Sequence, residues 1–355
     1  MAGQAGRVSL NSTPLIYNAN NFSHLQIAQE HRYIRRNQIR SISGMERLKK
    51  CGKVPFGPVT LGLRGSRAEQ HGFTTCGSIW ICPVCSSRIL AHRSQEVRQA
   101  VMNWEKQGGK FIFETFTLFH RSGETVAKQR LGIQAGWQKT NSGAGAKFNA
   151  SMGQVGYLRV LEVTYGENGF HLHMHVLRFL NSVPESNVLS TWKSANYERF
   201  SRGVMAAGFK KPSRKGHDFT VVTDAERVVG YFTKGFDNPQ LNEDSTSIWN
   251  LASKAIADPE SRYAALWRQW ERESKGMRQM TWSKGIREVV GLGEEIADED
   301  IATYEPFFEI EKGSLSAYSN LGGLLVRLRY HLEKGDLTSI EAILAEHEIA
   351  FNKGV

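Results

Sequence analysis

The sequence contains no long hydrophobic run. Nowhere in its 355 residues does a stretch approach the roughly 18 consecutive apolar residues of a membrane-spanning helix. The N-terminal segment MAGQAGRVSLNSTP also lacks the apolar core of a secretory signal peptide. We therefore expect a cytoplasmic protein with no membrane partner. In that compartment the four cysteines are expected to be reduced thiols or metal ligands rather than disulfides.

A nucleotide-binding phosphate loop is missing as well. The two Gly-Lys pairs, at 52–53 and 109–110, are followed by Val54 and Phe111, whereas the phosphate loop requires Ser or Thr at that place. The sequence therefore gives no indication that this chain hydrolyses ATP to separate DNA strands. If the protein acts on a duplex, that energy must come from a partner.

Acidic residues are scarce outside one segment. Lys and Arg number 45 against 35 Asp and Glu, which gives a net charge of +10. Residues 291–311 hold eight of the acids and no base, so the remaining chain carries 10 + 8, or +18. Basic residues concentrate in 31–53 and 193–215. This distribution favours a polyanionic partner such as nucleic acid.

The order of expected elements indicates an α+β fold. FIFETFTLF alternates as a strand does, and QRLGIQAGWQKTNS reads as a helix. GYLRVLEVTY and FHLHMHVLRFL flank GENG and predict a β-hairpin. A helix, NVLSTWKSANYERFSRGVMAAG, and a strand, HDFTVV, follow. The β-α-β-β-α-β order predicts an antiparallel sheet flanked by helices.

Composition divides the chain into four expected regions. Residues 1–45 are Asn-rich and Arg-rich without apolar periodicity, and we expect a flexible basic arm. Residues 46–105 contain all four cysteines and then a helix. Residues 106–290 hold the α+β domain. Residues 291–355 are expected to form an acidic linker and a helical C-terminal extension.

Three histidines alternate along one expected strand. Successive side chains of a strand point to opposite faces, so His171, His173 and His175 share one face, at a spacing of roughly 6–7 Å. If Asn168-Gly169 or Glu167-Asn168 is the hairpin turn, Glu162 lies opposite His175 or His173, respectively, on that same face. A three- or five-residue loop would reverse this parity. Imidazoles with a carboxylate suit Mn, Mg, Zn, Co or Ni.

A second pattern follows the basic stretch. In an expected helix over 224–236, the side chains of Asp224, Arg227, Tyr231 and Lys234 share one face. A phenol becomes a useful nucleophile only when its anion is stabilised, and a neighbouring lysine and a metal-held phosphate would both do so. The alternative is an ordinary amphipathic helix with a partly buried tyrosine.

Together these segments resemble the HUH endonucleases, and more closely the rolling-circle replication initiators (Rep proteins) of small bacterial plasmids. The resemblance covers roughly residues 46–300. It rests on FETFTL, on RVLEVTYGENGFHLHMHVL with its alternating histidines, on GYFTKG, and on LWRQWERESKGMRQMTWSKGIREVVGL. It implies a ferredoxin/RRM-like HUH sheet and an enzyme that nicks and rejoins single-stranded or hairpin origin DNA through a 5′-phosphotyrosine.

The resemblance also implies roles for individual residues. His173 and His175 stand where the family holds its catalytic Mn²⁺ or Mg²⁺, with His171 or Glu162 as third ligand. Tyr231 stands at the nucleophile and Lys234 at the motif lysine. For the acid of the closing strand transfer, Glu226 is nearest but fits a capping box with Thr223, and Asp224 has the better helical phase. A host helicase and polymerase are the implied partners.

The basic stretch 193–215 is a candidate surface for the DNA backbone. Its cations at the distal end are Lys210, Lys211, Arg214 and Lys215. Four aromatic residues in and beside the stretch are candidates for stacking on bases, with packing in the core as the alternative reading: Trp192, Tyr197, Phe200 and Phe209.

The cysteines have the spacing of a zinc site. Cys82-Pro83-Val84-Cys85 forms one knuckle, and Cys76 and Cys51 lie upstream. Four thiolates would make a closed, structural Zn²⁺ site in which His71 is an alternative to Cys51. Free buried cysteines and a redox pair are the other readings.

Two other functions compete with the replication initiator. Within the same superfamily the chain resembles a relaxase or a Tyr transposase, although relaxases usually carry the tyrosine before the histidines. Outside the enzymes, it would be a zinc-dependent DNA-binding regulator whose histidine row is vestigial.

Overall fold

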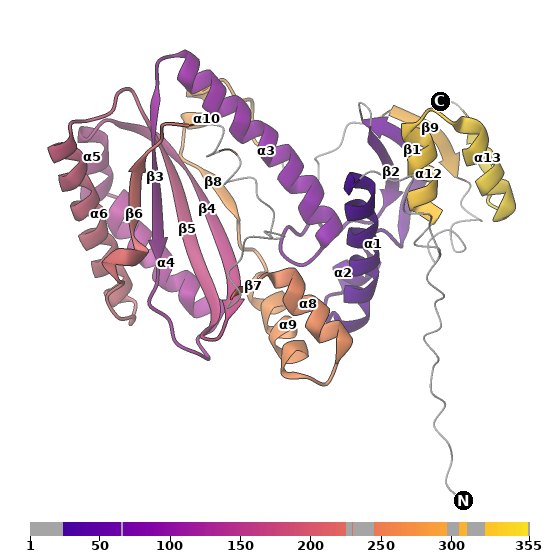
Figure 1. Ribbon diagram of the computed structural model, residues 1–355, viewed down its shortest axis with the longest axis horizontal. Helices are drawn as coiled ribbons and strands as arrows, with labels where there is room; N and C mark the ends of the chain where they lie inside the picture. The colour runs from indigo at the N-terminus through magenta and orange to yellow at the C-terminus, as the bar shows by residue number, and fades with distance from the viewer. Residues whose placement is uncertain are drawn as a thin grey trace, which may run out of the picture. The chain divides into compact units, whose positions relative to one another are not determined.

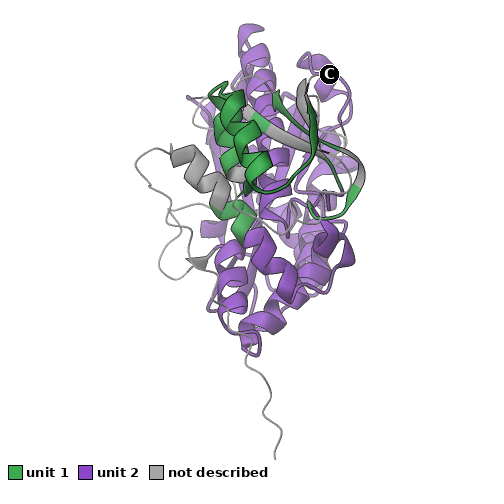
Figure 2. Ribbon diagram, turned by 90° about the vertical axis from the view of Figure 1, so that its right-hand side faces the viewer, with its two compact units in different colours: residues 1–34, 52–73, 303–355 green, residues 35–51, 74–302 purple. Residues whose placement is uncertain are grey.

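A computed structural model of the protein describes residues 24–64, 67–224, 229, 245–296, 305–310 and 324–353 (Figure 1). The chain forms two compact units. Figure 2 colours the smaller unit green, comprising residues 1–34, 52–73 and 303–355, and the larger unit purple, comprising 35–51 and 74–302. No helix among the described residues is long and apolar enough to cross a membrane.

The larger unit is an α+β structure around an antiparallel sheet. Its main elements in chain order are α2 (Glu46–Lys50), α3 (Pro83–Lys106), β3 (Lys110–Thr117), α4 (Val126–Asn141), α5 (Ala144–Ser151), β4 (Gln154–Gly166), β5 (Gly169–Leu180), α6 (Ser186–Ala206), the 3-10 turn η2 (Arg214–Gly216), β6 (Asp218–Val221), β7 (Ser245–Thr246), α8 (Ile248–Ala257), α9 (Arg262–Glu273), β8 (Met280–Trp282) and α10 (Ile286–Val289).

The sheet has the strand order β6-β3-β5-β4-β7, and β8 pairs with β4. All of these pairings are antiparallel. Within it, β3-α4-β4-β5-α6-β6 has the spatial order fourth, first, third, second, which is that of the split β-α-β or ferredoxin-like motif. The expected α+β class and antiparallel sheet are therefore confirmed.

The two faces of this sheet differ. One face, carrying Leu172, Met174 and Val176 of β5, is fully buried under helices, and α4, α5 and α6 lie on that side in Figure 1. The other face carries the histidines. One end of it is covered by α3, since Val97, Val101 and Trp104 share a hydrophobic cluster with Leu177 and Phe179.

A buried polar group lies on the helix-covered face. Glu114 of β3 has no exposed surface and accepts hydrogen bonds from Arg178, Asn196 and His217. Arg178, equally buried, also reaches Gln154. Burial alone raises the pKa of Glu114, but Arg178 and His217 outweigh it and hold the pKa below its usual range. The carboxylate is therefore ionised and paired inside the protein.

The smaller unit contains a second sheet. Its strands are β1 (Pro55–Arg64), β2 (Arg67–Phe73), β9 (Glu305–Ile310) and β10 (Phe351–Lys353), in the order β10-β9-β1-β2. The helices α12 (Leu324–Glu333) and α13 (Leu337–Glu346) contribute Leu328, Leu332 and Leu344 to its core beside Leu61. The helix α1 (His24–Ile42) spans the division between the two units.

These elements differ from three of the expected regions. Residues 24–42 of the expected flexible arm are helical, and 46–105 includes the β1–β2 hairpin in addition to the cysteine segment. The C-terminal region is not purely helical, because β9 and β10 pair with β1 and with each other. Pairing between segments about 250 residues apart leaves no local sequence signal, which is why composition did not indicate it.

Candidate metal and nucleic-acid site

The β4–β5 hairpin fixes which side chains meet the histidines. Gly166 pairs with Gly169, so the turn is Glu167-Asn168, the second of the two registers considered. Gly169 has φ 89°, a left-handed conformation that glycine adopts without strain. Glu162 consequently pairs with His173, and Val160 pairs with His175. The register places the Glu162 carboxylate on the histidine face.

Glu162, His173 and His175 come together at this face. One donor atom from each lies within 4.8 Å of the others. His175 Nε2 lies 3.1 Å from Glu162 Oε2. Ligands about 2.1 Å from one ion are roughly 3–3.5 Å apart, so this pair already has the required spacing. His175 is buried, and Glu162 keeps 34% of its side chain exposed, which leaves the group open to solvent on one side.

His171 lies beside this group rather than within it. Its Nδ1 is 2.8 Å from Nε2 of His173, and its ring stacks on His120 with centroids 4.5 Å apart. Burial, and then the neighbouring imidazoles, lower the pKa of His171 to about 3 and that of His173 to about 4. Both rings are therefore neutral near pH 7, which is the form that binds metal. Of the two candidates for third ligand, the geometry favours Glu162.

Two residues of β3 hold His175 in place and were not singled out from the sequence. Thr115 pairs with His175, and its Oγ1 lies 3.0 Å from Nδ1. Phe113 stacks on the same ring, with centroids 5.6 Å apart and planes 16° from parallel. With Nδ1 engaged by the hydroxyl, Nε2 is left to face Glu162. The alternation of FETFTL contained the signal, because it places Phe113 and Thr115 on one face.

The expected tyrosine helix falls largely outside the described residues. Tyr231, Lys234 and Glu226 all lie there, and Asp224 is described and exposed after β6. Val229, two positions before the tyrosine, is 1% exposed and belongs to the hydrophobic cluster of Leu177 and Phe179 on the histidine face.

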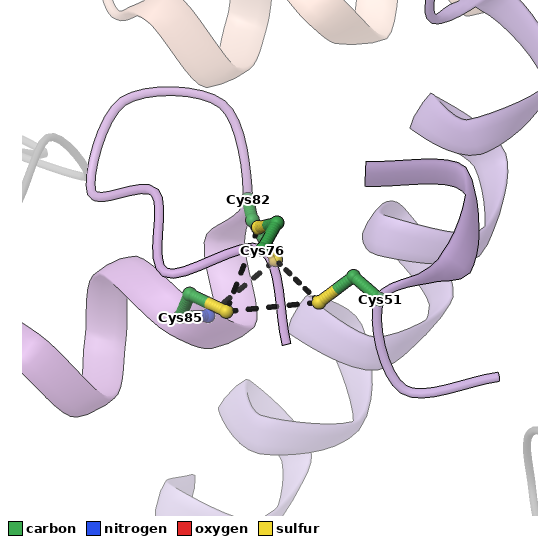
Figure 3. A group of neighbouring side chains, drawn as sticks. All are labelled: Cys51, Cys76, Cys82 and Cys85. Atoms are coloured by element: carbon green, nitrogen blue, oxygen red, sulfur yellow. Dashed lines mark hydrogen bonds between the residues drawn. The ribbon is translucent and has the colours of Figure 1, made fainter. Parts of the chain in front are cut away.

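All four cysteines of the chain converge in a buried cluster (Figure 3). Sγ of Cys51 lies 3.8 Å from Cys82 and 3.7 Å from Cys85, and Cys76 lies 3.6 Å from Cys85. Four sulfurs about 2.3 Å from a tetrahedral Zn²⁺ are about 3.8 Å apart, so the cluster fits zinc. Disulfides are excluded at these separations. Cys51 and His71 were the two candidates for the fourth ligand, and the structure places Cys51 in the cluster.

The pKa values of the four thiols shift in opposite directions: those of Cys51 and Cys85 are lowered, and those of Cys76 and Cys82 are raised, with burial the leading cause for Cys82. The Arg40 guanidinium donates to the carbonyl of Cys51, and burial lowers its pKa to about 10. Hydrogen bonding with the neighbouring thiols, foremost Cys76, lowers the pKa of Cys51, and the charge of Arg36 acts in the same direction. The backbone N–H of Cys85 points to the Cys82 sulfur 3.5 Å away, as in a metal knuckle at a helix N-terminus. The four sulfur donors and their spacing, rather than these shifts, therefore suit a closed structural site.

The basic stretch has exposed cations and buried aromatics. Lys210, Lys211, Arg214 and Lys215 are all exposed. Lys211 and Arg214 share Glu198, at 3.1 and 2.9 Å. The stacking expectation for this stretch is wrong because its aromatic residues are at most 7% exposed: Trp192, Tyr197, Phe200 and Phe209. They are core residues of α6 and the segment after it, and the sequence pattern could not distinguish the two uses.

Comparison with characterised proteins finds partial relatives. "Protein rep" of Streptomyces lividans is 25% identical over 294 residues, which cover 62% of this chain and 64% of that protein. "Neomycin resistance protein" of Streptomyces cyanogenus is 32% identical over 136 residues, 31% of each chain. The chain thus spans less than two thirds of the length of either relative. No family model and no solved structure matches it.

Proposed function

We propose that this protein is a plasmid replication initiator that nicks and rejoins single-stranded origin DNA. The observation that carries the proposal is the convergence of Glu162, His173 and His175 on one face of the sheet. The similarity to a protein named Protein rep supports a replication role. The expected compartment is the cytoplasm, and the absence of a phosphate loop in the sequence favours a separate helicase and polymerase as partners.

The chemistry is a transesterification with Tyr231 as nucleophile. Its phenolate oxygen attacks the scissile phosphorus and forms a 5′-phosphotyrosine, while the bond to the 3′ oxygen breaks and that oxygen takes up a proton. Attack by a 3′-hydroxyl on the phosphotyrosine reverses the step and rejoins the strand. Phosphodiester energy is retained throughout, so the cycle needs no nucleotide triphosphate.

A Mn²⁺ or Mg²⁺ ion held by Glu162, His173 and His175 would supply Lewis-acid stabilisation of the phosphate. His171 orients His173, and Thr115 orients His175. Lys234 is proposed to offset charge near the phenolate. Glu226 or Asp224 is proposed as the acidic residue whose carboxylate assists the closing strand transfer.

The position of Val229 supports Tyr231 as the nucleophile. Val229 belongs to a cluster on the histidine face, and Phe113, which stacks on His175, packs against the same cluster. Val229, which packs in this cluster, stands two positions before Tyr231 in the sequence.

The test is cleavage of a labelled single strand taken from the DNA around the gene, with Mn²⁺ or Mg²⁺ and with chelator. We expect metal-dependent cleavage and a covalent adduct, on the peptide containing Tyr231, with the 5′ end of the downstream fragment. Tyr231→Phe should lower cleavage by at least about 1000-fold because it removes the attacking oxygen. Tyr263→Phe, a tyrosine of α9, is the control and should cleave normally.

Unchanged cleavage by Tyr231→Phe would remove this residue from the mechanism. Specific DNA binding without cleavage under any metal would instead identify a zinc-dependent regulator. A covalent adduct on a different tyrosine would support the same enzyme class and assign the nucleophile to that other residue.

A further inference from the structure

Phe119 is an exposed aromatic side chain at the end of β3. It follows the buried Leu118 and keeps 45% of its surface exposed. Among the large hydrophobic residues that the described chain leaves exposed, it is the one aromatic. Leu118 is buried, whereas the ring of Phe119 is open to solvent. An exposed aromatic ring of this kind is available to a binding partner.

A cation lies over this ring. The Nζ of Lys210 is 5.3 Å from the Phe119 ring centroid. In the described part of the chain, Lys210 has no carboxylate partner, whereas its neighbour Lys211 is paired with Glu198. A π face beside an unneutralised cation is the combination by which single-stranded nucleic acid is held, through stacking on the base and attraction of the phosphate.

Phe119 directly precedes, in the chain, a residue that contacts the histidine row. The next residue, His120, stacks on His171, and His171 bonds to His173. Phe119 is therefore one residue away in the chain from the contacts that lead through His120 and His171 to the metal-binding group. An unpaired base on Phe119 would belong to a nucleotide near the phosphate at that group.

We propose that Phe119 and Lys210 form a stacking site for an unpaired base of single-stranded DNA flanking the scissile phosphate. This inference rests on the proposed nuclease function for its position in the reaction. Its DNA-binding part stands on the ring and the cation alone. The charge complementarity comes from Lys210, which is exposed and lies over the ring.

The experiment measures the dissociation constant for a fluorescent oligothymidine by anisotropy, with the full chain and without catalytic metal. Phe119→Ala should weaken binding about 5- to 150-fold, the range found when a stacking residue is removed. Phe119→Trp should restore it, because a larger ring stacks at least as well. Met102→Ala, an equally exposed apolar residue of α3, is the matched control and should bind as the parent does.

A second readout does not depend on how the variants fold. Irradiation of the wild-type protein bound to an iodouracil-substituted strand should cross-link the peptide containing Phe119, as identified by mass spectrometry. Equal affinities of Phe119→Ala and the parent, or cross-links confined to other peptides, would overturn the proposal.

The two proposals fail separately. If the parent never cleaves DNA but Phe119→Ala loses affinity for single-stranded DNA, the stacking site is supported and the nuclease function is refuted. If cleavage depends on Tyr231 while Phe119→Ala binds and cleaves as the parent does, the nuclease stands and the stacking site is refuted.

Discussion

Thr115 shows how one hydroxyl can decide the chemistry of a histidine. Its contact with Nδ1 of His175, 3.0 Å long, selects the nitrogen that remains for an ion. Such contacts behind a ligand tune metal affinity even though they never touch the metal.

Thr115→Val should therefore weaken Mn²⁺ binding about 10- to 100-fold while preserving the shape of the side chain. Titration followed by electron paramagnetic resonance measures this. Thr117→Val is the control, since that hydroxyl on the same strand face bonds to the carbonyl of Gly216. Equal metal affinities in the two variants would show that the hydroxyl of Thr115 does not tune the site.

Glu114 and Arg178 are the other decisive pair, and both side chains are fully buried. Glu114→Gln should lower the free energy of unfolding by about 3–5 kcal/mol, because the buried guanidinium loses its counter-charge. Urea denaturation measures the change. Glu198→Gln removes an exposed partner of Lys211 and should cost less than about 1 kcal/mol.

The same carboxylate predicts a pH dependence. Because Arg178 and His217 place its native pKa below the ordinary value, the ionised form stabilises the fold above the unfolded pKa. That stabilisation is lost as pH falls through the lowered native pKa. The stability difference between the parent and Glu114→Gln should be largest near neutral pH and shrink in acid. A difference that grew on acidification would contradict the assignment.

At the scale of elements, the cysteine segment supports the histidine strand. Trp80, between Cys76 and Cys82, packs edge-on against Trp270 of α9 at 5.6 Å, and Trp270 stacks on Phe170 at 5.8 Å. Phe170 directly precedes His171 in β5. A continuous aromatic contact therefore connects the cluster to the strand that carries the metal ligands.

We expect about one Zn²⁺ per chain, held by the cysteines. Cys82→Ser should lose it and lower the melting temperature by roughly 10 °C, since ~1 kcal/mol corresponds to about 2–4 °C in a domain of this size. Elemental analysis and calorimetry measure both. His173→Ala should retain the zinc. If His173→Ala loses the zinc and Cys82→Ser keeps it, the zinc belongs to the histidine group and not to the cysteines.

At the scale of the whole molecule, net charge influences binding over longer distances than packing or hydrogen bonding does. A net charge of +10 with one acidic segment at 291–311 leaves the rest of the chain strongly positive. Two described units divide the chain, and the histidine group and cysteine cluster both belong to the larger one. Under the proposed function, the exposed basic residues of the larger unit, such as Lys215, are the ones expected to contact DNA.

Affinity for single-stranded DNA should fall steeply with salt, by about 0.7 in the logarithmic slope for each phosphate contact. Lys215→Gln should reduce the slope by about that amount for every DNA sequence, since it removes one contact. Lys106→Gln, an exposed cation at the end of α3, should leave the slope unchanged. A salt-independent affinity would exclude phosphate contacts as the source of binding.

Much of the candidate site followed from local patterns. The alternation of HLHMH placed three imidazoles on one face, and the Cys-Pro-Val-Cys knuckle identified the cysteine segment. The same periodicity yielded the strand and helix order of the larger unit. These properties depend on residues near one another in the chain, so the sequence alone determined them.

Tertiary structure decided the remainder. The turn at Glu167-Asn168 selected which histidine faces Glu162, and the packing of α6 buried the aromatics expected to stack. The pairing of β1 with β9 and the exposure of Phe119 were likewise absent from any local pattern. Register and burial depend on the distant strand or helix that supplies the partner surface, and that partner exists only once the chain has folded.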